Sequence, residues 1–412
     1  MYRDNCIVAQ SGGPTAVINS SLYGIINNAI KCGKFQNVYG GLYGVEGIIK
    51  GKIINILDLP FEVINKSRYS PAAALGTCRY RLKDFNEDET DYIKIFSVFK
   101  KYNIRSFFYI GGNDSMDTAL KINKYAQKIG YDIKVIGVPK TIDNDLLYTD
   151  HCPGYGSAAK YIATTTLELA LDSDAYDTNI INILEVMGRD AGWLAAASAL
   201  AKKKFLKLNQ LIYLPEVSFD EKNFLNDIES AYSINRNLFI VLSEGIVDKN
   251  GNYVMQYNSD NEKDSFGHIQ LGGVSNYIGK ILKKNISNKV KIKITKLGST
   301  QRCAMHIASK VDFDEADLLG RKAVDFCIKD MNSIMVALER LSTKPYICDV
   351  KAVDLTSVCN KVKKVPLYMI NERGNFVTDE FINYVEPLIY GNVKQPFNYD
   401  LPSYINLNIF SY

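Results

Sequence analysis

Short runs of apolar and β-branched residues alternate along the chain with stretches that have helical character. The apolar runs are continuous, which is typical of strands in a parallel sheet that helices cover on both faces. Strands are predicted at Cys6–Gln10, Ser106–Ile110, Ile133–Val138, Ile180–Val186, Gln210–Leu214, Leu238–Leu242 and Val290–Thr295. Helices are predicted at Thr118–Ile129, Ser157–Leu171 and Gly192–Lys203. This alternation predicts an α/β fold.

The length of the chain, 412 residues, favours two lobes or one large α/β body over a string of small modules. We expect a first lobe over residues 1–150, rejoined by about 275–330. The second lobe is expected over residues 151–274, with residues 331–412 packing on it. No linker rich in Pro, Gly or Ser marks the boundary, so we expect the chain to cross between the lobes more than once.

Composition excludes several classes of partner. The formal net charge is only +4, and basic runs with interleaved aromatic residues are absent, so we expect no nucleic acid partner. No segment approaches the roughly 20 apolar residues of a membrane helix, and the short polar N-terminus does not resemble a signal peptide. The eight cysteines form no CxxC pair, so neither a disulfide framework nor a cysteine metal site is expected. A cytoplasmic protein is the expectation.

Two loops that contain glycine pairs follow predicted strands. They are Ser11-Gly12-Gly13-Pro14-Thr15 and Gly111-Gly112-Asn113-Asp114-Ser115. Glycine lets the backbone approach an anion closely, and the helix predicted after each loop offers unpaired N–H groups. Neither loop matches G-x-x-x-x-G-K-[ST] or G-x-G-x-x-G, which excludes an ordinary P-loop and the usual dinucleotide fold. Either loop alone would also suit a tight turn, but the pair favours a phosphate cradle.

Two carboxylates, a cation and a hydroxyl follow the predicted strand Ile133–Val138 within a few residues, in Pro139-Lys140-Thr141-Ile142-Asp143-Asn144-Asp145. Two aspartates at positions i and i+2 of an extended loop point the same way, and each shifts the pKa of the other, which suits one of them as a base. Lys140 would supply positive charge for phosphoryl oxygens. The alternative is an Asx turn whose charges are solvated.

Arginines stand beside glycines at three further places: Arg79 and Arg81, Arg189 directly after a strand, and Arg302. Guanidinium groups in such loops suit bidentate phosphate contacts, although surface ion pairing is the commoner role of a single arginine. Histidine occurs only three times, which disfavours histidine-based catalysis or a histidine metal site.

Four segments together form a specific pattern: Gly111–Ser115, Pro139–Asp145, Glu185-Val186-Met187-Gly188-Arg189 and Gln301-Arg302. In their order and spacing they resemble the 6-phosphofructokinases, from about Cys6 to about Phe326. The resemblance implies two Rossmann-like lobes with mainly parallel sheets covered by helices, the first binding the phosphoryl donor and the second the sugar phosphate. It also implies Mg²⁺ as cofactor and a homo-oligomer, either a dimer or a tetramer.

The resemblance implies roles for individual residues. Asp143 resembles the base that takes the proton of the sugar 1-hydroxyl, with Thr141 and Asp145 beside it, and Arg79 resembles the contact to the transferred phosphoryl group. The expected donor site comprises Gly12, Gly13, Gly112, Asn113, Asp114 and Lys140, of which Asn113 and Asp114 would also hold the metal. The expected contacts to fructose 6-phosphate are Thr141, Asp143, Met187, Gly188, Arg189, Glu244 and Arg302, the last of these at the 6-phosphate.

The choice of phosphoryl donor depends on Asp114 and Lys140. ATP-using relatives have glycine at both positions, whereas the Asp–Lys pairing resembles pyrophosphate-dependent members, as does the segment Phe266–Gly273. Asp114 would place bulk and negative charge where the α-phosphate and ribose of ATP pass, and Lys140 would offer its ammonium to pyrophosphate. We therefore expect reversible phosphoryl transfer from pyrophosphate to the 1-hydroxyl of fructose 6-phosphate, giving fructose 1,6-bisphosphate and phosphate.

Three positions depart from the family pattern. Asn113 replaces a frequent magnesium-site aspartate, Ile180 replaces a 6-phosphate arginine usually supplied by a neighbouring subunit, and Ser299 replaces a histidine. Lys293 and Lys296 are the candidate substitutes at the 6-phosphate. An ATP-dependent 6-phosphofructokinase and a non-catalytic regulatory subunit of the same fold remain alternatives. The segment after about residue 332 carries no motif, and packing or a subunit contact is expected there.

Overall fold

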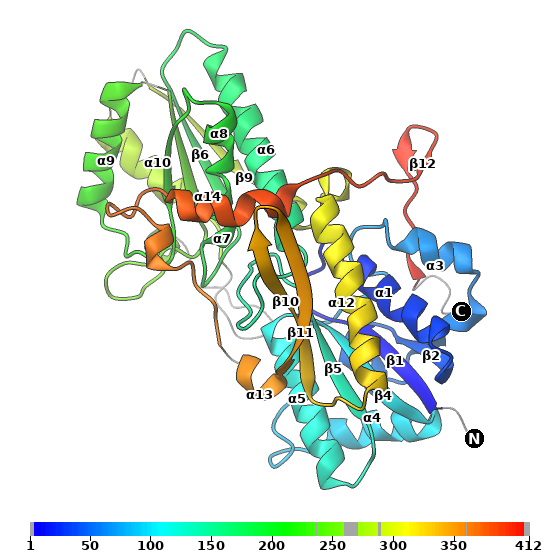
Figure 1. Ribbon diagram of the computed structural model, residues 1–412. Coiled ribbons are helices and arrows are strands. Elements are labelled where there is room, and N and C mark those ends of the chain that lie inside the picture. The colour runs from blue at the N-terminus through cyan, green and yellow to red at the C-terminus, as the bar shows by residue number, and fades with distance from the viewer. Residues whose placement is uncertain (1–3, 236, 259–270, 287–289, 360, 408–412) are drawn as a thin grey trace.

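The computed structural model describes residues 4–235, 237–258, 271–286, 290–359 and 361–407. In this part of the chain, a seven-stranded sheet and a four-stranded sheet form the centres of two lobes (Figure 1). Most strands run parallel, and each sheet has a hydrophobic core on both faces. This confirms the predicted fold class. Each of the seven predicted strands overlaps a strand of the structure.

The sheet of the first lobe has the strand order β11-β10-β5-β4-β1-β2-β3. Strands β3 and β11 pair antiparallel at the two edges, and the others run parallel. The strands are β1 (Asp4–Gln10), β2 (Phe35–Gly41), β3 (Ile53–Asn55), β4 (Ile104–Gly111), β5 (Lys134–Pro139), β10 (Ile334–Thr343) and β11 (Tyr346–Asp354). Its covering helices are α1 (Ile18–Lys31), α2 (Gly44–Ile49), α3 (Phe61–Ser67), α4 (Thr90–Lys101), α5 (Asn113–Lys128), α12 (Lys310–Ile328) and α13 (Leu355–Val358).

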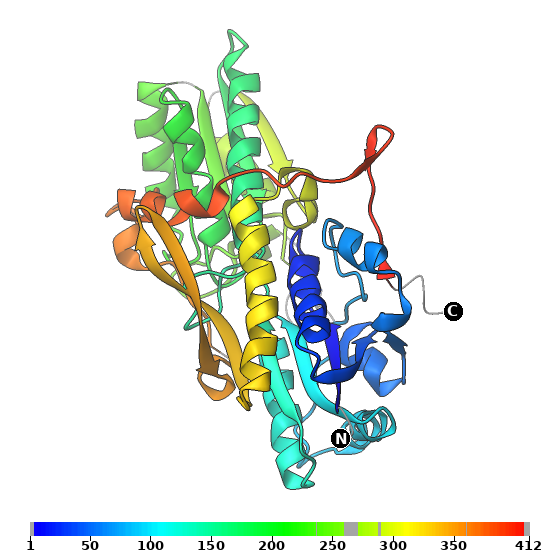
Figure 2. The same ribbon diagram turned by 45° about the vertical axis from the view of Figure 1, so that its right-hand side comes forward.

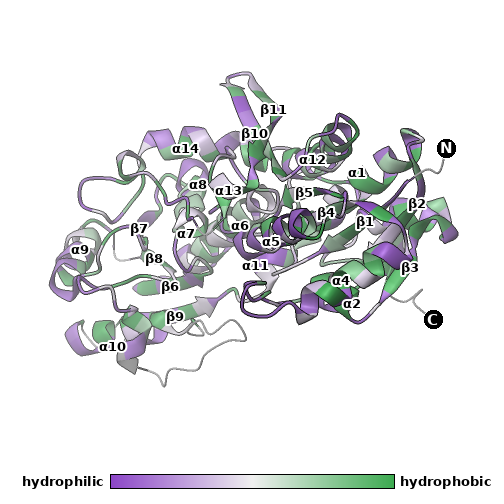
Figure 3. Cartoon of the chain, turned by 90° about the horizontal axis from the view of Figure 1, so that it is seen from below, coloured by the Kyte–Doolittle hydropathy of each residue, from purple (hydrophilic) through white to green (hydrophobic). Residues whose placement is uncertain are grey.

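The sheet of the second lobe has the order β7-β8-β6-β9, and all its strands run parallel. The strands are β6 (Ile180–Val186), β7 (Asn209–Tyr213), β8 (Leu238–Ser243) and β9 (Lys291–Lys296). The helices around it are α6 (Tyr155–Asp174), α7 (Trp193–Ala197), α8 (Leu200–Lys204), α9 (Glu221–Ile234), α10 (Val274–Asn285), α11 (Thr300–Cys303) and α14 (Asp379–Val385). Figure 3 shows the two lobes side by side, with the green, apolar strands at the centre of each.

Short elements complete the chain. The 3-10 helices are η1 (Ile56–Asp58), η2 (Val254–Asn258), η3 (Met305–Ile307), η4 (Leu367–Met369) and η5 (Glu386–Ile389). The strands β12 (Phe397–Asn398) and β13 (Leu401–Pro402) form a small hairpin. Among the described residues, no helix has both the length and the apolar character that crossing a membrane requires.

The sheets divide the chain differently from the expected boundaries. Strand β9 and all but the first residue of helix α10 lie within 275–330 but belong to the second lobe, because β9 pairs with β6 and α10 packs in the core of that lobe. Strands β10 and β11 lie within 331–412 but extend the first sheet, because β10 pairs with β5. The segment that includes Met369, Phe381 and Leu388 packs into the core of the second lobe, and Tyr346 of β11 packs against that core. These pairings join segments that are distant in sequence, so local pattern does not reveal them.

Two predicted helices also have different limits. The helix predicted from Thr118 begins at Asn113, directly after the second glycine loop, so its first turn belongs to the site. The stretch predicted as one helix, Gly192–Lys203, forms the two short helices α7 and α8.

Helices α1 and α12 pack closely through two glycines. A Cβ atom on Gly24 would lie 2.3 Å from the carbonyl oxygen of Asp317, and one on Gly320 would lie 2.2 Å from that of Ser21. Both distances are far below van der Waals contact, so larger residues would push the helices apart. This contact fixes the helix that follows the first glycine loop.

A carboxylate of α12 also holds the start of α6. Asp312 Oδ1 accepts from the Gly154 amide at 2.9 Å, and Oδ2 accepts from the Ser157 amide at 2.9 Å. These bonds satisfy amides that have no partner within the helix. Helix α12, rejoining the first lobe, therefore orients the first helix of the second lobe (Figure 2).

Candidate active site

A cleft of about 290 Å³ lies between the lobes and is lined by loops that follow β1, β4, β5, β6 and β8. Ligands bind at this edge of parallel sheets in α/β proteins generally. The predicted site residues that line it are Gly12, Gly13, Arg79, Gly112, Asn113, Asp114, Lys140, Thr141, Asp143, Asp145, Met187, Arg189, Glu244 and Arg302. Gly188 is not in the lining; its carbonyl accepts from the Ser243 hydroxyl at 2.5 Å and holds the loop in place.

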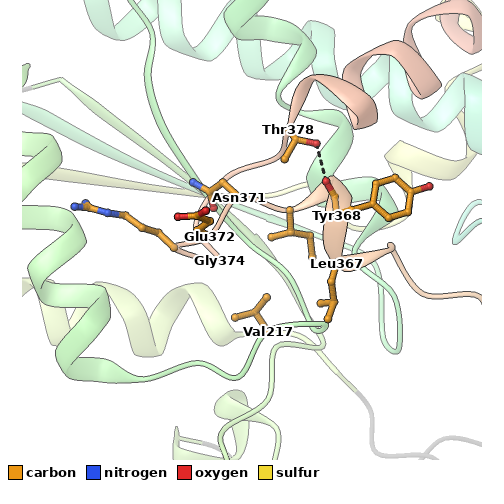
Figure 4. A pocket seen from close by; sticks show the side chains of 9 residues that line it. Val217, Leu367, Tyr368, Asn371, Glu372, Gly374 and Thr378 are labelled. Carbon is orange, nitrogen blue, oxygen red and sulfur yellow. Dashed lines mark hydrogen bonds between the residues drawn. The ribbon is translucent and has the colours of Figure 1, made fainter.

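A more open hollow of about 700 Å³ lies against the second lobe, between Val217 and the segment Leu367–Thr378 (Figure 4). Its lining includes one carboxylate, Glu372, and one guanidinium, Arg373, and none of the predicted site residues. The smaller cleft contains the glycine loops and the predicted charged residues, so we place the candidate active site there.

The two glycine loops bring backbone close to Lys140. Its Nζ donates to the Gly13 carbonyl at 2.7 Å, and a Cβ atom on Gly12 would lie only 3.2 Å from this nitrogen. Gly12 also has a φ of +75°, which a residue with a side chain adopts only with strain. The loop after β4 ends at Gly112, directly before the first turn of α5, where Asp114 is exposed to the cleft.

Lys140 lies at the centre of a positive cluster. The side chain is only 3% exposed. Burial lowers its pKa to about 8; Asp143 opposes this shift, whereas Arg302 and Arg79 add to it. These three cations act on one another through their charges, and an anion with several charges would stabilise them together.

Asp143 has the electrostatic character of a base that works near neutral pH. Burial raises its pKa to about 7, the charges of Asp145 and Glu244 add to the shift, and Lys140 opposes it. Asp143 is only half-buried and lines the cleft, so a bound substrate can reach its carboxylate. The amide of Asp143 donates to the Thr141 hydroxyl oxygen at 3.1 Å, which holds the loop in its turn.

The second lobe contributes a charged wall opposite the donor loops. Burial raises the pKa of Glu244 to about 7, the Glu185 charge adds to the shift, and a backbone hydrogen bond and Arg189 oppose it. The Met187 amide donates to Gln301 Oε1 at 3.1 Å, so the loop after β6 is tied to the segment around α11. Hydrogen-bonding groups and an arginine here suit a polar, anionic substrate.

Arg302 lies beside the donor loop. Its Nη1 is 3.3 Å from the position of a Cβ atom on Gly13, and burial together with the Arg79 charge lowers its pKa. From the sequence we expected Arg302 at the 6-phosphate, and this stays a prediction; the structure places its guanidinium beside Gly13 and near Lys140.

Of the three positions that depart from the family pattern, Asn113 lines the cleft, and Ile180 and Ser299 lie at the second sheet and beyond it. Ile180 is buried at the start of β6, and Ser299 precedes α11. Lys293 pairs with Asp172 at 2.7 Å, and Lys296 Nζ lies 3.8 Å from the position of a Cβ atom on Gly273. Of the segment Phe266–Gly273, residues 266–270 lie outside the described residues.

Some lining residues were not assigned from the sequence: Ser11, Pro14, Tyr80, Ser115, Ile142 and Asp190. Most of them have uncharged side chains and were passed over because they only neighbour the motif residues in sequence. Asp190 was recognisable, because it directly follows Arg189 and places another carboxylate in the same loop.

Comparison with known proteins agrees with this geometry. The profile of the family described as "Phosphofructokinase" matches residues 5–327. "Pyrophosphate--fructose 6-phosphate 1-phosphotransferase" of Halomonas elongata is 39% identical over 410 residues, covering 99% of this chain and 97% of the relative. A crystal structure of pyrophosphate-dependent phosphofructokinase from Nitrosospira multiformis has a TM-score of 0.89 and 37% identity, covering 98% of this chain and 96% of that one.

A protein named "Sulfofructose kinase", from Alkalicoccus urumqiensis, is 31% identical over 370 residues, which are 89% of this chain and 92% of that relative. The prediction from the four sequence motifs is therefore confirmed at the level of the family. From its cleft, its two sheets and these relatives, this chain belongs to the phosphofructokinase family.

Proposed function

We propose that this protein transfers a phosphoryl group from pyrophosphate to the 1-hydroxyl of fructose 6-phosphate, giving fructose 1,6-bisphosphate and phosphate, and that it catalyses the reverse reaction. The observation that carries the proposal is the placement of Lys140, Asp143 and Asp114 in one cleft between two glycine loops. The names of the relatives in Halomonas and Nitrosospira support the same reaction.

Asp143 acts as the base. Its carboxylate takes the proton of the sugar 1-hydroxyl while the oxygen attacks the nearer phosphorus of pyrophosphate. The bond from that phosphorus to the bridging oxygen breaks, and phosphate leaves with the electron pair. Because the pKa of Asp143 is raised to about 7, the group can accept this proton and return it in the reverse reaction.

The positive cluster neutralises the charge on the transferring phosphoryl group. Lys140, Arg79 and Arg302 supply fixed cations at the donor loop, which is where a phosphoryl-transfer transition state carries charge on its oxygens. The glycine loops let the donor approach the backbone and hold it in line with the hydroxyl.

The donor site favours pyrophosphate over ATP for a steric reason. Asp114 occupies the first turn of α5 at the edge of the cleft, and Lys140 fills the space beside Gly12. A nucleotide must carry its α-phosphate and ribose past the donor loops, whereas pyrophosphate ends there. A carboxylate beside an α-phosphate would also repel it.

Mg²⁺ fits this site if the substrate completes its coordination. Among the residues that the structure describes, no three His, Cys, Asp or Glu side chains lie together as a metal site. Mg²⁺ usually keeps few protein ligands and binds phosphate oxygens and water for the rest. Asp114 and the amide oxygen of Asn113 would hold the ion here, where it would offset negative charge on pyrophosphate.

The acceptor site is formed from the second lobe. Met187, Arg189 and Glu244 line it, with Thr141 and Asp143 at the reacting end. The protein is expected to work as a homo-oligomer, because family resemblance suggests that a neighbouring subunit completes the 6-phosphate site. Analytical ultracentrifugation should give a dimer or a tetramer, and a monomer that is fully active would contradict this.

A coupled assay tests the function directly. Purified protein with Mg²⁺ and fructose 6-phosphate should form fructose 1,6-bisphosphate with pyrophosphate and far more slowly with ATP. Sulfofructose, the acceptor in the name of one relative, serves as the comparison substrate. Preference for ATP would identify the nucleotide-dependent alternative, and inactivity with every donor and acceptor would favour the regulatory subunit.

A further inference from the structure

A short C-terminal segment, here called the strap, contacts loops that line the candidate active site. The strap, residues 361–365, follows α13 and lies beyond the range matched by the family profile. The chain crosses here from the first lobe to the second (Figure 1). The segment carries no recognisable motif, yet it contacts two of the loops that line the proposed site.

The first contact is with the donor loop. Asn113 Nδ2 donates to the carbonyl oxygen of Lys361 at 2.8 Å. An aspartate at position 113 has only acceptor oxygens when ionised and could not donate this bond. Asn113, which replaces the family's aspartate, therefore makes a hydrogen bond to the strap that an ionised aspartate could not make.

The second contact is with the loop of Asp143, residues 139–145. The backbone amide of Lys363 donates to the Asp145 carbonyl at 2.7 Å. Its ammonium donates to the carbonyls of Asp150 at 2.8 Å and Thr149 at 3.1 Å, and to Asn144 Oδ1 at 3.4 Å. All three hydrogens of the ammonium thus have acceptors in one stretch of chain.

Asn144 links these hydrogen bonds to Asp143, its neighbour in the loop. It is fully buried and has a φ of +55°, so the loop turns sharply between the two aspartates. Its Nδ2 donates to the Tyr384 hydroxyl at 2.8 Å, and that hydroxyl donates to the Asp150 carbonyl at 2.8 Å. Tyr384 belongs to α14, so a second C-terminal element holds the same loop.

The strap itself is anchored in the second lobe. The Val365 amide donates to Glu216 Oε1 at 2.8 Å, and the Trp193 indole donates to the Lys363 carbonyl at 2.9 Å. Val365 belongs to the core of that lobe. Lys363 therefore connects the acceptor lobe to the loop of the base, which follows a strand of the donor sheet.

We propose that Lys363 is a positioning residue that fixes the loop of Asp143, and thereby the Asp143 carboxylate, relative to the acceptor bound on the second lobe. This inference rests on the proposed function. In-line transfer requires the base to lie within hydrogen-bond reach of the hydroxyl, and an error of about 1 Å can cost on the order of 10²-fold in rate. A substrate can still bind when the base is slightly displaced, so the effect falls on kcat.

The test compares kcat and KM of the full chain with those of K363M, Y384F and K203M, with folding checked by circular dichroism and thermal melting. K363M removes the ammonium but keeps a side chain of similar length, and should lower kcat on the order of 10²-fold. The KM values for pyrophosphate and for fructose 6-phosphate should stay within about threefold of the wild-type values, because the contacts that bind the substrates are preserved. Y384F removes one hydroxyl and should lower kcat by about tenfold.

K203M is the matched control. Lys203 pairs with Glu386, just after α14, so K203M makes the same change against the same C-terminal part but away from the loop. Its kcat should equal that of the wild type. Folded K363M and Y384F enzymes with wild-type kcat would overturn the proposal, as would an equal loss of kcat in K203M. If K363M does not fold, Y384F alone decides.

The wild type in the same assay separates the two proposals. If the wild type uses pyrophosphate and the variants keep the wild-type kcat, only the proposed role of Lys363 is contradicted. If the wild type used ATP instead, the proposed donor would be wrong, and the variants would be compared with ATP.

Discussion

At the scale of single residues, Asp143 carries the strongest claim, because its burial and its charged neighbours raise its pKa into the range of a base at neutral pH. The D143N variant keeps the size of the side chain but accepts a proton poorly. We expect kcat to fall by about 10²- to 10⁴-fold with little change in KM. The coupled assay measures this, with D177N, at an exposed aspartate, as the control.

The same variant should be more stable than the wild type above about pH 7. A carboxyl whose pKa is raised by folding disfavours the folded state once it ionises, and asparagine removes that charge. Thermal melting at about pH 8 measures the difference. Near-normal turnover by D143N would contradict its assignment as the base.

The pH profile follows from the same group. kcat/KM should rise with pH through about 7, because Asp143 must lose its proton before it can act. After burial, the charge of Asp145 is the largest cause that raises this pKa, so D145N should move the acid limb to lower pH. An acid limb that stays in place in D145N would contradict the electrostatic account.

Donor choice is also decided by single residues. The D114G/K140G double variant removes the carboxylate at the start of α5 and the ammonium beside Gly12. We expect its ratio of kcat/KM for ATP to that for pyrophosphate to rise by at least about tenfold, because space opens and a repulsive charge is lost. Kinetics with both donors measure the ratio, and D114G alone separates the two contributions. An unchanged ratio would contradict the steric explanation.

At the scale of elements, a buried charge network holds the chain that follows the loop of Asp143. His151 is 1% exposed and bonds Asp150 at 2.8 Å and Glu315 of α12 at 2.7 Å. Burial lowers its pKa, but the two carboxylates outweigh this and raise it to about 9. Other ionisable groups that face this network include Asp312, Arg340, Tyr346, Cys348, Lys363 and Tyr384.

This network predicts a pH-dependent stability. Since the folded pKa of His151 lies above the unfolded value of about 6.5, its stabilisation is complete below about pH 6.5 and is lost as pH rises through about 9. H151Q should lower the free energy of unfolding by about 3 kcal/mol at pH 6, and by clearly less at pH 9.5. Urea unfolding measures both, with H306Q, at an exposed histidine, as the control. A loss that does not depend on pH would contradict this account.

The strands near the site were predictable because their side chains are apolar on both faces and their ends carry glycine or charge. Cys6–Gln10, Ser106–Ile110 and Ile133–Val138 all correspond to strands of the first sheet. Strands β2, β3, β10 and β11 were not predicted. The burial of β10 changes from complete at Ile334–Leu338 to partial beyond it, and β11 alternates or is half exposed, so neither shows one clear pattern.

At the scale of the whole molecule, the C-terminal part, from β10 onward, packs on both lobes. The hairpin of β10 and β11 extends the first sheet, and Arg340 on it donates to the Tyr384 carbonyl of α14 at 2.9 Å. Residues 361–389 then pack on the second lobe. The expected lobe boundaries missed this division, because it depends on strand pairing across more than 190 residues between β5 and β10.

The sequence by itself determined the fold class, the family and most of the residues that line the cleft, because glycine loops, the two aspartates and the arginines are short local motifs tied to strand ends. The tertiary structure decided what local pattern does not contain: which lobe β9 and β10 join, and that Arg302 lies beside the donor loop. It also showed that Lys363 and Tyr384 hold the loop of Asp143. Those relations arise from contacts between residues far apart in the chain, and only folding brings them together.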